Sequence, residues 1–215
     1  MLPSSKIWLY RITHLDNLGW ILKHGIASGV SELADPGFIS IGDNTLIEFR
    51  EDMDIPVSPF GKFSEYIPFY FGPRAPMLYQ IATGYDGIKK IPQSNIIYLV
   101  SRLDIIQSAG LQFIFTDGHA RATITTFFTA NETKKLKELD WSVIYSTDWK
   151  NTEQDKDRQR RKQAECLIKD FIPTTCVERI LVFDENSHEK VLSLIHESNL
   201  SIPVQIKKAA YYDPL

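Results

Sequence analysis

Seven short segments rich in aromatic and β-branched residues are spread along the whole chain, and they constrain the fold more than any other feature. Such runs are typical of β-strands. They are separated by stretches of unequal length, and helix-like patterns lie between only some of them. This mixture lacks the regular strand–helix alternation of a doubly wound sheet, so it predicts an α+β fold. The seven segments are 6–13, 65–73, 95–101, 111–118, 164–172, 177–184 and 202–208.

Helices are predicted where an apolar stripe lies between a start signal and a stop signal. The stretch 16–25 has Asp16 as its N-cap and Gly25 as its stop. Proline at the first helical position begins 76–84, and 187–198 has an amphipathic pattern. Weaker helical patterns lie at 42–52, 103–110, 119–128 and 131–140.

Size and composition indicate one folded domain that spans residues 1–215. Apolar residues make up 43% of the chain and charged residues 24%, which is typical of a globular protein. A chain of this length allows two small domains, but we find no internal repeat, low-complexity tract or linker. The net charge of −3 argues against a general nucleic-acid coat protein, so any contact with nucleic acid must be local.

Cysteine content and hydropathy predict a cytoplasmic protein without a membrane partner. The two cysteines are too few for a disulfide framework. The N-terminal apolar run is interrupted by Arg11 and His14, which excludes a typical signal peptide. No run approaches the roughly 20 apolar residues of a membrane span.

Several common catalytic and binding motifs are missing from the sequence. It contains no G-x-G-x-x-G, no P-loop, no H-E-x-x-H, no C-x-x-C and no G-x-S-x-G. The five histidines do not have the spacing of metal ligands. We therefore expect no Rossmann or P-loop nucleotide site and no catalytic metal.

The stretch 9–17 places a strand directly before a capped helix. Backbone N–H groups at such a corner can bind the polar edge or phosphate of a ligand. Arg11, Thr13, His14 and Asn17 would surround that ligand. The alternative is a strand–helix corner whose polar residues serve only as caps.

Two further segments combine aromatic residues with turn signals. In 65–78 an aromatic strand precedes P-R-x-P, and its rings either pack in the core or offer a stacking surface for a base. Pro68 in that strand favours a sheet edge or a bulge. In 113–120 the strand ends at Asp117 and His119 around a glycine, a pattern that a simple Asx turn also produces.

Glu165 stands where a polar, mostly charged run changes into an apolar strand. It is either the exposed acid of an amphipathic segment or a carboxylate held at the mouth of a cleft. No second acid follows at i+2, which disfavours the paired carboxylates of a glycosidase. A lone acid suits stabilisation of a developing cation. The preceding basic residues, Lys156, Arg158, Arg160, Arg161 and Lys162, either hold a DNA backbone or form a solvated mixed-charge loop.

The order of five segments resembles the DarT family of DNA ADP-ribosyltransferase toxins. These segments are YRITHLDNLGWILKHG, YIPFYFGPRAPMLY, FIFTDGHA, ELDW and QAECLI, and the resemblance runs from about residue 8 to about residue 183. It implies an ADP-ribosyltransferase-like fold with a central, mostly antiparallel sheet. It also implies transfer of ADP-ribose from NAD, as co-substrate, onto a base of single-stranded DNA, with release of nicotinamide and without a metal.

The resemblance also assigns roles to residues. It implies Glu165 and Arg50 as catalytic residues, with Arg50 also contacting NAD. Many members have histidine where this chain has Arg11. The element that covers NAD corresponds to about 34–52, and the loop that presents the target base to about 111–157. Further cofactor-binding positions are Arg11, Ile12, Thr13, Trp20, Ser28 and Tyr70, and DNA-binding positions are Arg74, Met77 and His119.

The expected partners are single-stranded DNA and, from the resemblance, a macrodomain antitoxin that removes the modification. Two other functions remain open at this stage. One is an RNA 2′-phosphotransferase-like enzyme, which has the same fold and also consumes NAD. The other is a non-catalytic nucleic-acid-binding module that retains the fold without the chemistry.

Overall fold

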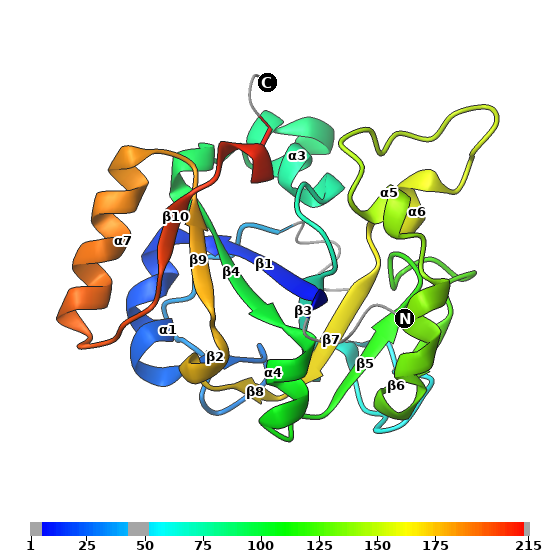
Figure 1. Ribbon diagram of the computed structural model, residues 1–215, viewed down its shortest axis with the longest axis horizontal. Coiled ribbons are helices and arrows are strands. Elements are labelled where there is room, and N and C mark those ends of the chain that lie inside the picture. The colour runs from blue at the N-terminus through cyan, green and yellow to red at the C-terminus, as the bar shows by residue number, and fades with distance from the viewer. Residues whose placement is uncertain (1–5, 43–51, 213–215) are drawn as a thin grey trace.

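The computed structural model describes residues 6–42 and 52–212, which form a mixed sheet flanked by helices (Figure 1). The sheet has the strand order β10-β9-β4-β1-β3-β7-β5-β6, and all neighbours pair antiparallel except β10 and β9. This architecture confirms the α+β fold with a mostly antiparallel central sheet. In sheet order the strands are Val204–Ile206, Arg179–Val182, Ile96–Arg102, Trp8–His14, Tyr66–Tyr70, Glu165–Lys169, Phe113–Thr116 and Phe127–Thr129.

Helices and a small second sheet surround the central sheet. The second sheet pairs β2 (Ile26–Ala27) with β8 (Phe171–Ile172). The α-helices are α1 (Leu18–His24), α3 (Pro76–Thr83), α4 (Leu103–Ser108), α5 (Trp141–Ile144), α6 (Arg158–Lys162) and α7 (Glu185–Glu197). Short 3-10 helices span Leu15–Asn17, Phe63–Glu65, Tyr85–Gly87, Gln93–Asn95, Ala130–Glu138, Thr174–Cys176 and Lys208–Ala210.

The central sheet opens between β1 and β3. β1 pairs with β4 over its full length, but its pairing with β3 is limited to Tyr10 opposite Tyr70. Beyond that pair, the guanidinium of Arg11 reaches across and donates to the Pro68 carbonyl at 3.1 Å. The prediction that Pro68 marks an edge strand was wrong, because β3 lies between β1 and β7. Proline is tolerated there because its backbone faces the opening, where an N–H would have no ladder partner.

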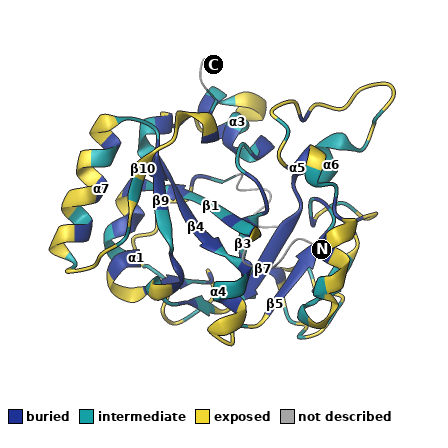
Figure 2. Cartoon of the chain, in the orientation of Figure 1, coloured by how far each residue is buried: buried dark blue, intermediate teal, exposed yellow. Residues whose placement is uncertain are grey.

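Both faces of β4 are buried (Figure 2), because side chains pack against it on either side of the sheet. On one face, Leu9 and Leu99 pack with residues of α1 and α7. On the other, Tyr98 packs with α3 and the C-terminal segment. The buried Tyr211 closes this second core, since its hydroxyl hydrogen-bonds to the carbonyls of Ile96 at 2.9 Å and Leu181 at 3.0 Å.

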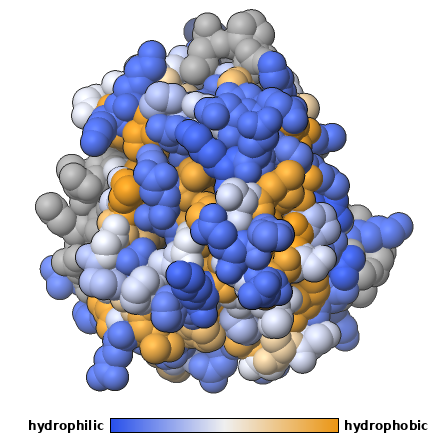
Figure 3. All heavy atoms as spheres, turned by 90° about the vertical axis from the view of Figure 1, so that its left-hand side faces the viewer, coloured by the Kyte–Doolittle hydropathy of each residue, from blue (hydrophilic) through white to orange (hydrophobic). Residues whose placement is uncertain are grey.

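The outer surface beside α7 and β10 is largely hydrophilic, with apolar atoms reaching it between the polar side chains (Figure 3). Leu192 and Ile206 are exposed apolar residues of these two elements. Within residues 6–42 and 52–212, no helix has both the length and the apolar character needed to cross a membrane.

The helix predictions were partly wrong in detail. Gly25 ends α1 with φ of 83°, as expected, but Asp16 is not the N-cap. Instead, His14 caps a 3-10 turn by accepting from the Asp16 N–H, and Asn17 precedes α1.

Two of the weaker helical patterns do not form α-helices, and a third cannot be compared. Residues 119–128 form a turn and the start of β6, and 130–138 form a 3-10 helix. In the turn, side chains replace helical partners: the Thr126 N–H bonds to the Asp117 carboxylate at 2.9 Å. The predicted helix at 42–52 lies almost wholly outside the described residues.

Gly72 allows α5 to pack directly on the segment that follows β3. A Cβ atom at Gly72 would collide with the Ile144 carbonyl. We predict that Gly72→Ala lowers the free energy of unfolding by about 1–3 kcal/mol, because α5 must move away. Urea denaturation measures this change. Gly19→Ala in α1 is the control, since its Cβ would meet only Leu194 at 3.9 Å. Equal stability of the two variants would contradict the prediction.

Candidate functional site

A cavity of about 410 Å³ lies at the opening between β1 and β3. Five of the predicted site residues line it: Arg11, Ile12, Tyr70, Met77 and His119. These residues come from β1, β3, α3 and the turn after β5, so the fold brings together segments far apart in sequence. The remaining lining residues are Gly29, Val30, Phe38, Ser40, Ile41, Gly42, Phe63, Ser64, Tyr66, Pro68 and Ile81.

Glu165 begins β7, directly opposite Tyr70 of β3. Tyr70 therefore pairs with Tyr10 on one side and with Glu165 on the other, at the point where the sheet opens. The backbone of Glu165 is fixed by Thr116, whose hydroxyl accepts from the Glu165 N–H at 3.1 Å. The catalytic candidate thus lies beside a residue that lines the cavity.

The side chain of Glu165 is more deeply buried than the sequence led us to expect. Glu165 is 0% exposed, which excludes an exposed acid on an amphipathic segment. The expectation that its carboxylate is exposed to the cleft was also wrong, since the residue has no solvent-exposed surface. Glu165 belongs to an interior strand, since β7 pairs with β3 on one edge and with β5 on the other.

Asn17 fixes one wall of the cavity to the corner between β1 and α1. Its side-chain amide bonds to both backbone groups of Ile39: Nδ2 donates to the carbonyl at 2.9 Å, and Oδ1 accepts from the N–H at 2.8 Å. Nδ2 also donates to the hydroxyl of Thr13 at 2.9 Å. Asn17 and Thr13 are both 1% exposed, so they act inside the protein as supports for the segment before Gly42.

Three predicted cofactor-binding residues lie away from the cavity wall. The hydroxyl of Thr13 accepts the hydrogen bond from Asn17 described above. Trp20 packs its ring on His24, with centroids 4.1 Å apart. Ser28 is 3% exposed, and its N–H donates to the Asp170 carbonyl at 2.8 Å. The structure therefore does not bring these three side chains into the cavity.

Arg74 is held by the C-terminal segment beside the cavity rather than within its wall. Its φ of 56° is unusual for a residue with a Cβ. Its Nε donates to the Tyr211 carbonyl at 2.8 Å, and its own carbonyl accepts from the Tyr212 hydroxyl at 2.8 Å. Its N–H donates to the hydroxyl of Tyr98 at 3.1 Å. Arg50 lies outside the described residues.

Apart from the exposed Lys156, the basic residues before Glu165 bond to other parts of the protein and do not form a solvated loop. Arg158 donates to the Asp148 carbonyl at 2.8 Å and to the Ser146 hydroxyl at 3.1 Å. Arg161 forms ion pairs with Asp140 at 3.1 Å and Asp155 at 2.7 Å. These side chains therefore connect α6 to α5 and to the loop between them.

Lys162 is a buried cation that joins three backbone segments. It is 2% exposed, and its ammonium donates to the carbonyls of Pro73, Ile144 and Ser146 at 2.9, 2.6 and 2.9 Å. Burial, with a smaller effect of Arg74, lowers the pKa of Lys162 to about 8. All three ammonium hydrogens have an acceptor, which offsets the loss of water.

Sequence reasoning missed most of the lining residues from the segment before Gly42 and from the turn before β3. Two signals pointed to the first of these without naming its residues: a long loop inside a compact domain, and the NAD-covering element that the resemblance places at about 34–52. Within the described ranges, no group of three or more His, Cys, Asp or Glu side chains is arranged to hold a metal ion.

Comparison with known proteins identifies the family. The sequence model described as "ssDNA thymidine ADP-ribosyltransferase, DarT" matches residues 10–212. The chain belongs to the DarT family. A DNA ADP-ribosyl transferase of Escherichia coli O127:H6 is 32% identical over 211 residues, which is 98% of this chain and 96% of that protein.

Solved structures of a DarT protein have the same fold. The DarT of Thermus sp. 2.9 in complex with ADP-ribosylated ssDNA matches with a TM-score of 0.87 and 33% identity, covering 96% of each chain. The same protein in complex with NAD+ matches with a TM-score of 0.83. A DNA ADP-ribosyl transferase–DNA ADP-ribosyl glycohydrolase fusion protein of Thermosipho africanus is 25% identical over 195 residues, 90% of this chain and 47% of the fusion.

Asn17 provides a test of how the cavity wall is held. We predict that Asn17→Ala lowers the free energy of unfolding by about 1–3 kcal/mol, because buried partners of the amide at Ile39 and Thr13 lose their hydrogen bonds. Chemical denaturation measures the loss, and limited proteolysis should show faster cleavage between residues 28 and 42. Asn186→Ala, on the exposed side of α7, is the control. Unchanged protection of 28–42 would contradict this role for Asn17.

Proposed function

We infer that this protein transfers ADP-ribose from NAD onto a base of single-stranded DNA and releases nicotinamide. The family match over residues 10–212 carries this conclusion, because it covers every element that builds the cavity. It also decides between the two NAD-consuming alternatives, in favour of the DNA transferase over the RNA 2′-phosphotransferase. From the family description, we propose thymidine as the modified nucleoside. We further propose that the chain acts as a single domain.

We propose that NAD occupies the cavity between β1 and β3, with Arg11, Ile12 and Tyr70 as contacts. The cavity volume of about 410 Å³ lies in the range of pockets that bind small ligands. Arg11 supplies positive charge for the diphosphate from a half-buried position, and it is already oriented by the Pro68 carbonyl. Tyr66 and Tyr70 provide an aromatic wall for the nicotinamide ring. We assign Thr13, Trp20 and Ser28 to support of this site, since they lie outside the cavity.

Glu165 is our proposed catalytic residue. Cleavage of the bond between ribose C1′ and the nicotinamide nitrogen leaves an oxocarbenium-like cation. A carboxylate that accepts a hydrogen bond from the ribose 2′-OH stabilises this cation, and it does so more strongly in a site from which water is excluded. The position of Glu165 supports such a role, because it pairs with Tyr70, which lines the cavity. For Arg50 we propose electrostatic stabilisation of NAD or of the base edge, because arginine does not readily give up a proton.

The acceptor in this proposal is a ring or exocyclic nitrogen of an unpaired base. A duplex hides these atoms, and extrusion of a base costs a few kcal/mol, which explains the preference for single strands. Met77 and His119 line the cavity, and we propose that they contact the target base. Arg74 borders the same region, and we propose that it contacts the DNA backbone through the part of its guanidinium beyond Nε.

We also propose a partner that reverses the reaction. In the Thermosipho africanus relative, a DNA ADP-ribosyl transferase and a DNA ADP-ribosyl glycohydrolase form one fusion protein. A separate macrodomain antitoxin would serve this chain in the same way and would allow it to act as a toxin. Because NAD and DNA are both intracellular, we propose the cytoplasm as the place of reaction.

Replacement of Glu165 tests the assignment. We predict that Glu165→Gln lowers the rate of DNA modification by at least about 100-fold, because the neutral amide stabilises the ribosyl cation poorly. Mass spectrometry of short single-stranded oligonucleotides with NAD measures the addition of one ADP-ribose. Glu197→Gln, in α7, is the control. Wild-type protein that consumes NAD without modifying DNA would point to another acceptor, and an active Glu165→Gln variant would exclude the catalytic role.

A further inference from the structure

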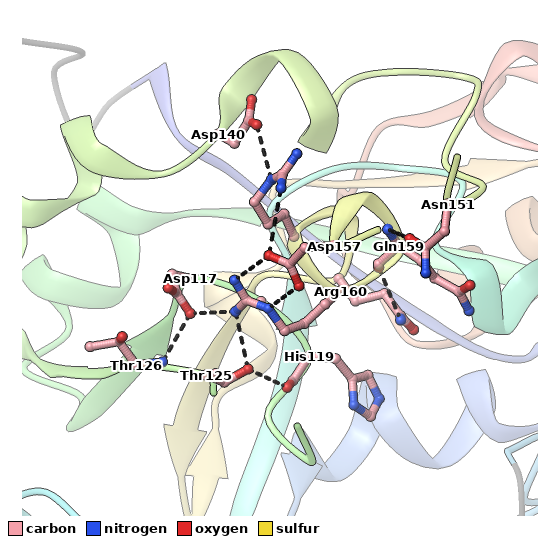
Figure 4. Close-up of polar contacts among 12 residues, drawn as sticks. Asp117, His119, Thr125, Thr126, Asp140, Asn151, Asp157, Gln159 and Arg160 are labelled. Carbon is pink, nitrogen blue, oxygen red and sulfur yellow. Dashed lines mark hydrogen bonds and ion pairs between the residues drawn. The ribbon is translucent and has the colours of Figure 1, made fainter. Parts of the chain in front are cut away.

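The turn from Asp117 to Thr126 carries His119 into the cavity and is held at both of its ends (Figure 4). At the ends, the Asp117 carboxylate accepts from the Thr126 N–H at 2.9 Å. In the middle, the Thr125 hydroxyl donates to the His119 carbonyl at 2.7 Å. These bonds give the turn its shape, but they do not fix its position relative to the rest of the protein.

Arg160 of α6 fixes the position of the turn relative to the rest of the protein. One of its terminal nitrogens, Nη1, donates to Asp117 Oδ1 at 2.7 Å and to Thr125 Oγ1 at 3.2 Å. Its backbone carbonyl accepts from the His119 N–H at 2.9 Å. A single residue therefore binds the turn at Asp117 and Thr125 through its side chain, as Figure 4 shows, and at His119 through its backbone carbonyl.

Asp157 holds the other side of the Arg160 guanidinium. Nε and Nη2 donate to the two carboxylate oxygens at 2.7 and 2.8 Å, a bidentate pair. The hydrogen bonds with Asp157 and Asp117 raise the pKa of Arg160 above its ordinary value. The side chain is only 13% exposed, so solvent competes little for these contacts.

Two close contacts connect this arrangement to the catalytic candidate. Gly118 lies directly on the Arg160 side chain, and a Cβ there would collide with the guanidinium. The Thr116 hydroxyl donates to the Gly118 carbonyl at 2.7 Å and accepts from the Glu165 N–H at 3.1 Å. The turn is thus placed relative to both Arg160 and Glu165.

We propose that Arg160 is a positioning residue, which sets the place of His119 in the cavity and through it the place of the target base. This inference rests on the proposed contact of His119 with DNA. We assign Arg160 a positioning role rather than a phosphate contact, because four of its five guanidinium N–H groups donate within the protein. Lysine cannot replace it, since a single ammonium cannot bind Asp157 in a bidentate manner and reach Asp117 as well.

The test compares the kinetics of Arg160→Lys with those of the matched control Arg158→Lys. Arg158 lies in the same helix, but its hydrogen bonds are accepted by Ser146 and Asp148 rather than by the turn. We expect Arg160→Lys to raise KM for a single-stranded oligonucleotide about tenfold, as when one positioning contact is weakened. KM for NAD should remain within about twofold, and Arg158→Lys should behave as the wild type.

His119→Ala and the double variant His119→Ala/Arg160→Lys separate this inference from the proposed function. If Arg160 acts through His119, the double variant has the same KM for DNA as His119→Ala alone. A normal KM for His119→Ala would overturn the proposed DNA contact of His119. A raised KM for His119→Ala with a normal KM for Arg160→Lys would overturn the positioning role. Additive effects in the double variant would also overturn it.

Asp117→Asn provides a second variant in case Arg160→Lys does not fold. It weakens the link to the turn and leaves the pair between Arg160 and Asp157 in place. The expected result is the same selective rise in KM for DNA. A parallel loss of affinity for NAD and DNA, together with a lower melting temperature, would show a purely structural role and overturn the proposal.

Discussion

The limited pairing of β1 with β3 is the constraint on which the site depends. Tyr10 opposite Tyr70 is where the two strands meet, and beyond it the sheet opens into the cavity. The opening has a stable shape because each strand is fully paired on its other side, β1 with β4 and β3 with β7. The bond from Arg11 to the Pro68 carbonyl then spans the opening. An interruption of the ladder, rather than an added loop, therefore provides the binding space.

Much of the fold could be predicted from local patterns, because the strands are short apolar runs and α7 has an amphipathic pattern. The errors occurred where a side chain replaced a backbone partner. His14 took the capping role expected of Asp16, and Thr125 with Asp117 shaped a turn in place of a helix. Pro68 was misjudged for another reason: its local signal was correct, but strand order depends on pairing between distant segments, which no local pattern contains.

The site was predictable only in part. The resemblance named Arg11, Ile12, Tyr70, Met77 and His119, and all five line the cavity. It did not indicate that Asn17 holds the wall, that Lys162 joins three carbonyls, or that Arg160 carries the turn of His119. These residues act through contacts between segments distant in sequence. A basic run is typical of an exposed loop, and its conversion into an internal network depends on aspartates as far away as Asp117.

The closing of the second core by Tyr211 has a consequence for how the protein folds during translation. This tyrosine binds the carbonyls of β4 and β9, and its neighbour Tyr212 holds the backbone of Arg74. A chain emerging from the ribosome lacks these bonds until residues 211 and 212 have left the exit tunnel. The region beside the cavity is therefore not completed until residues 211 and 212 are free to fold against it.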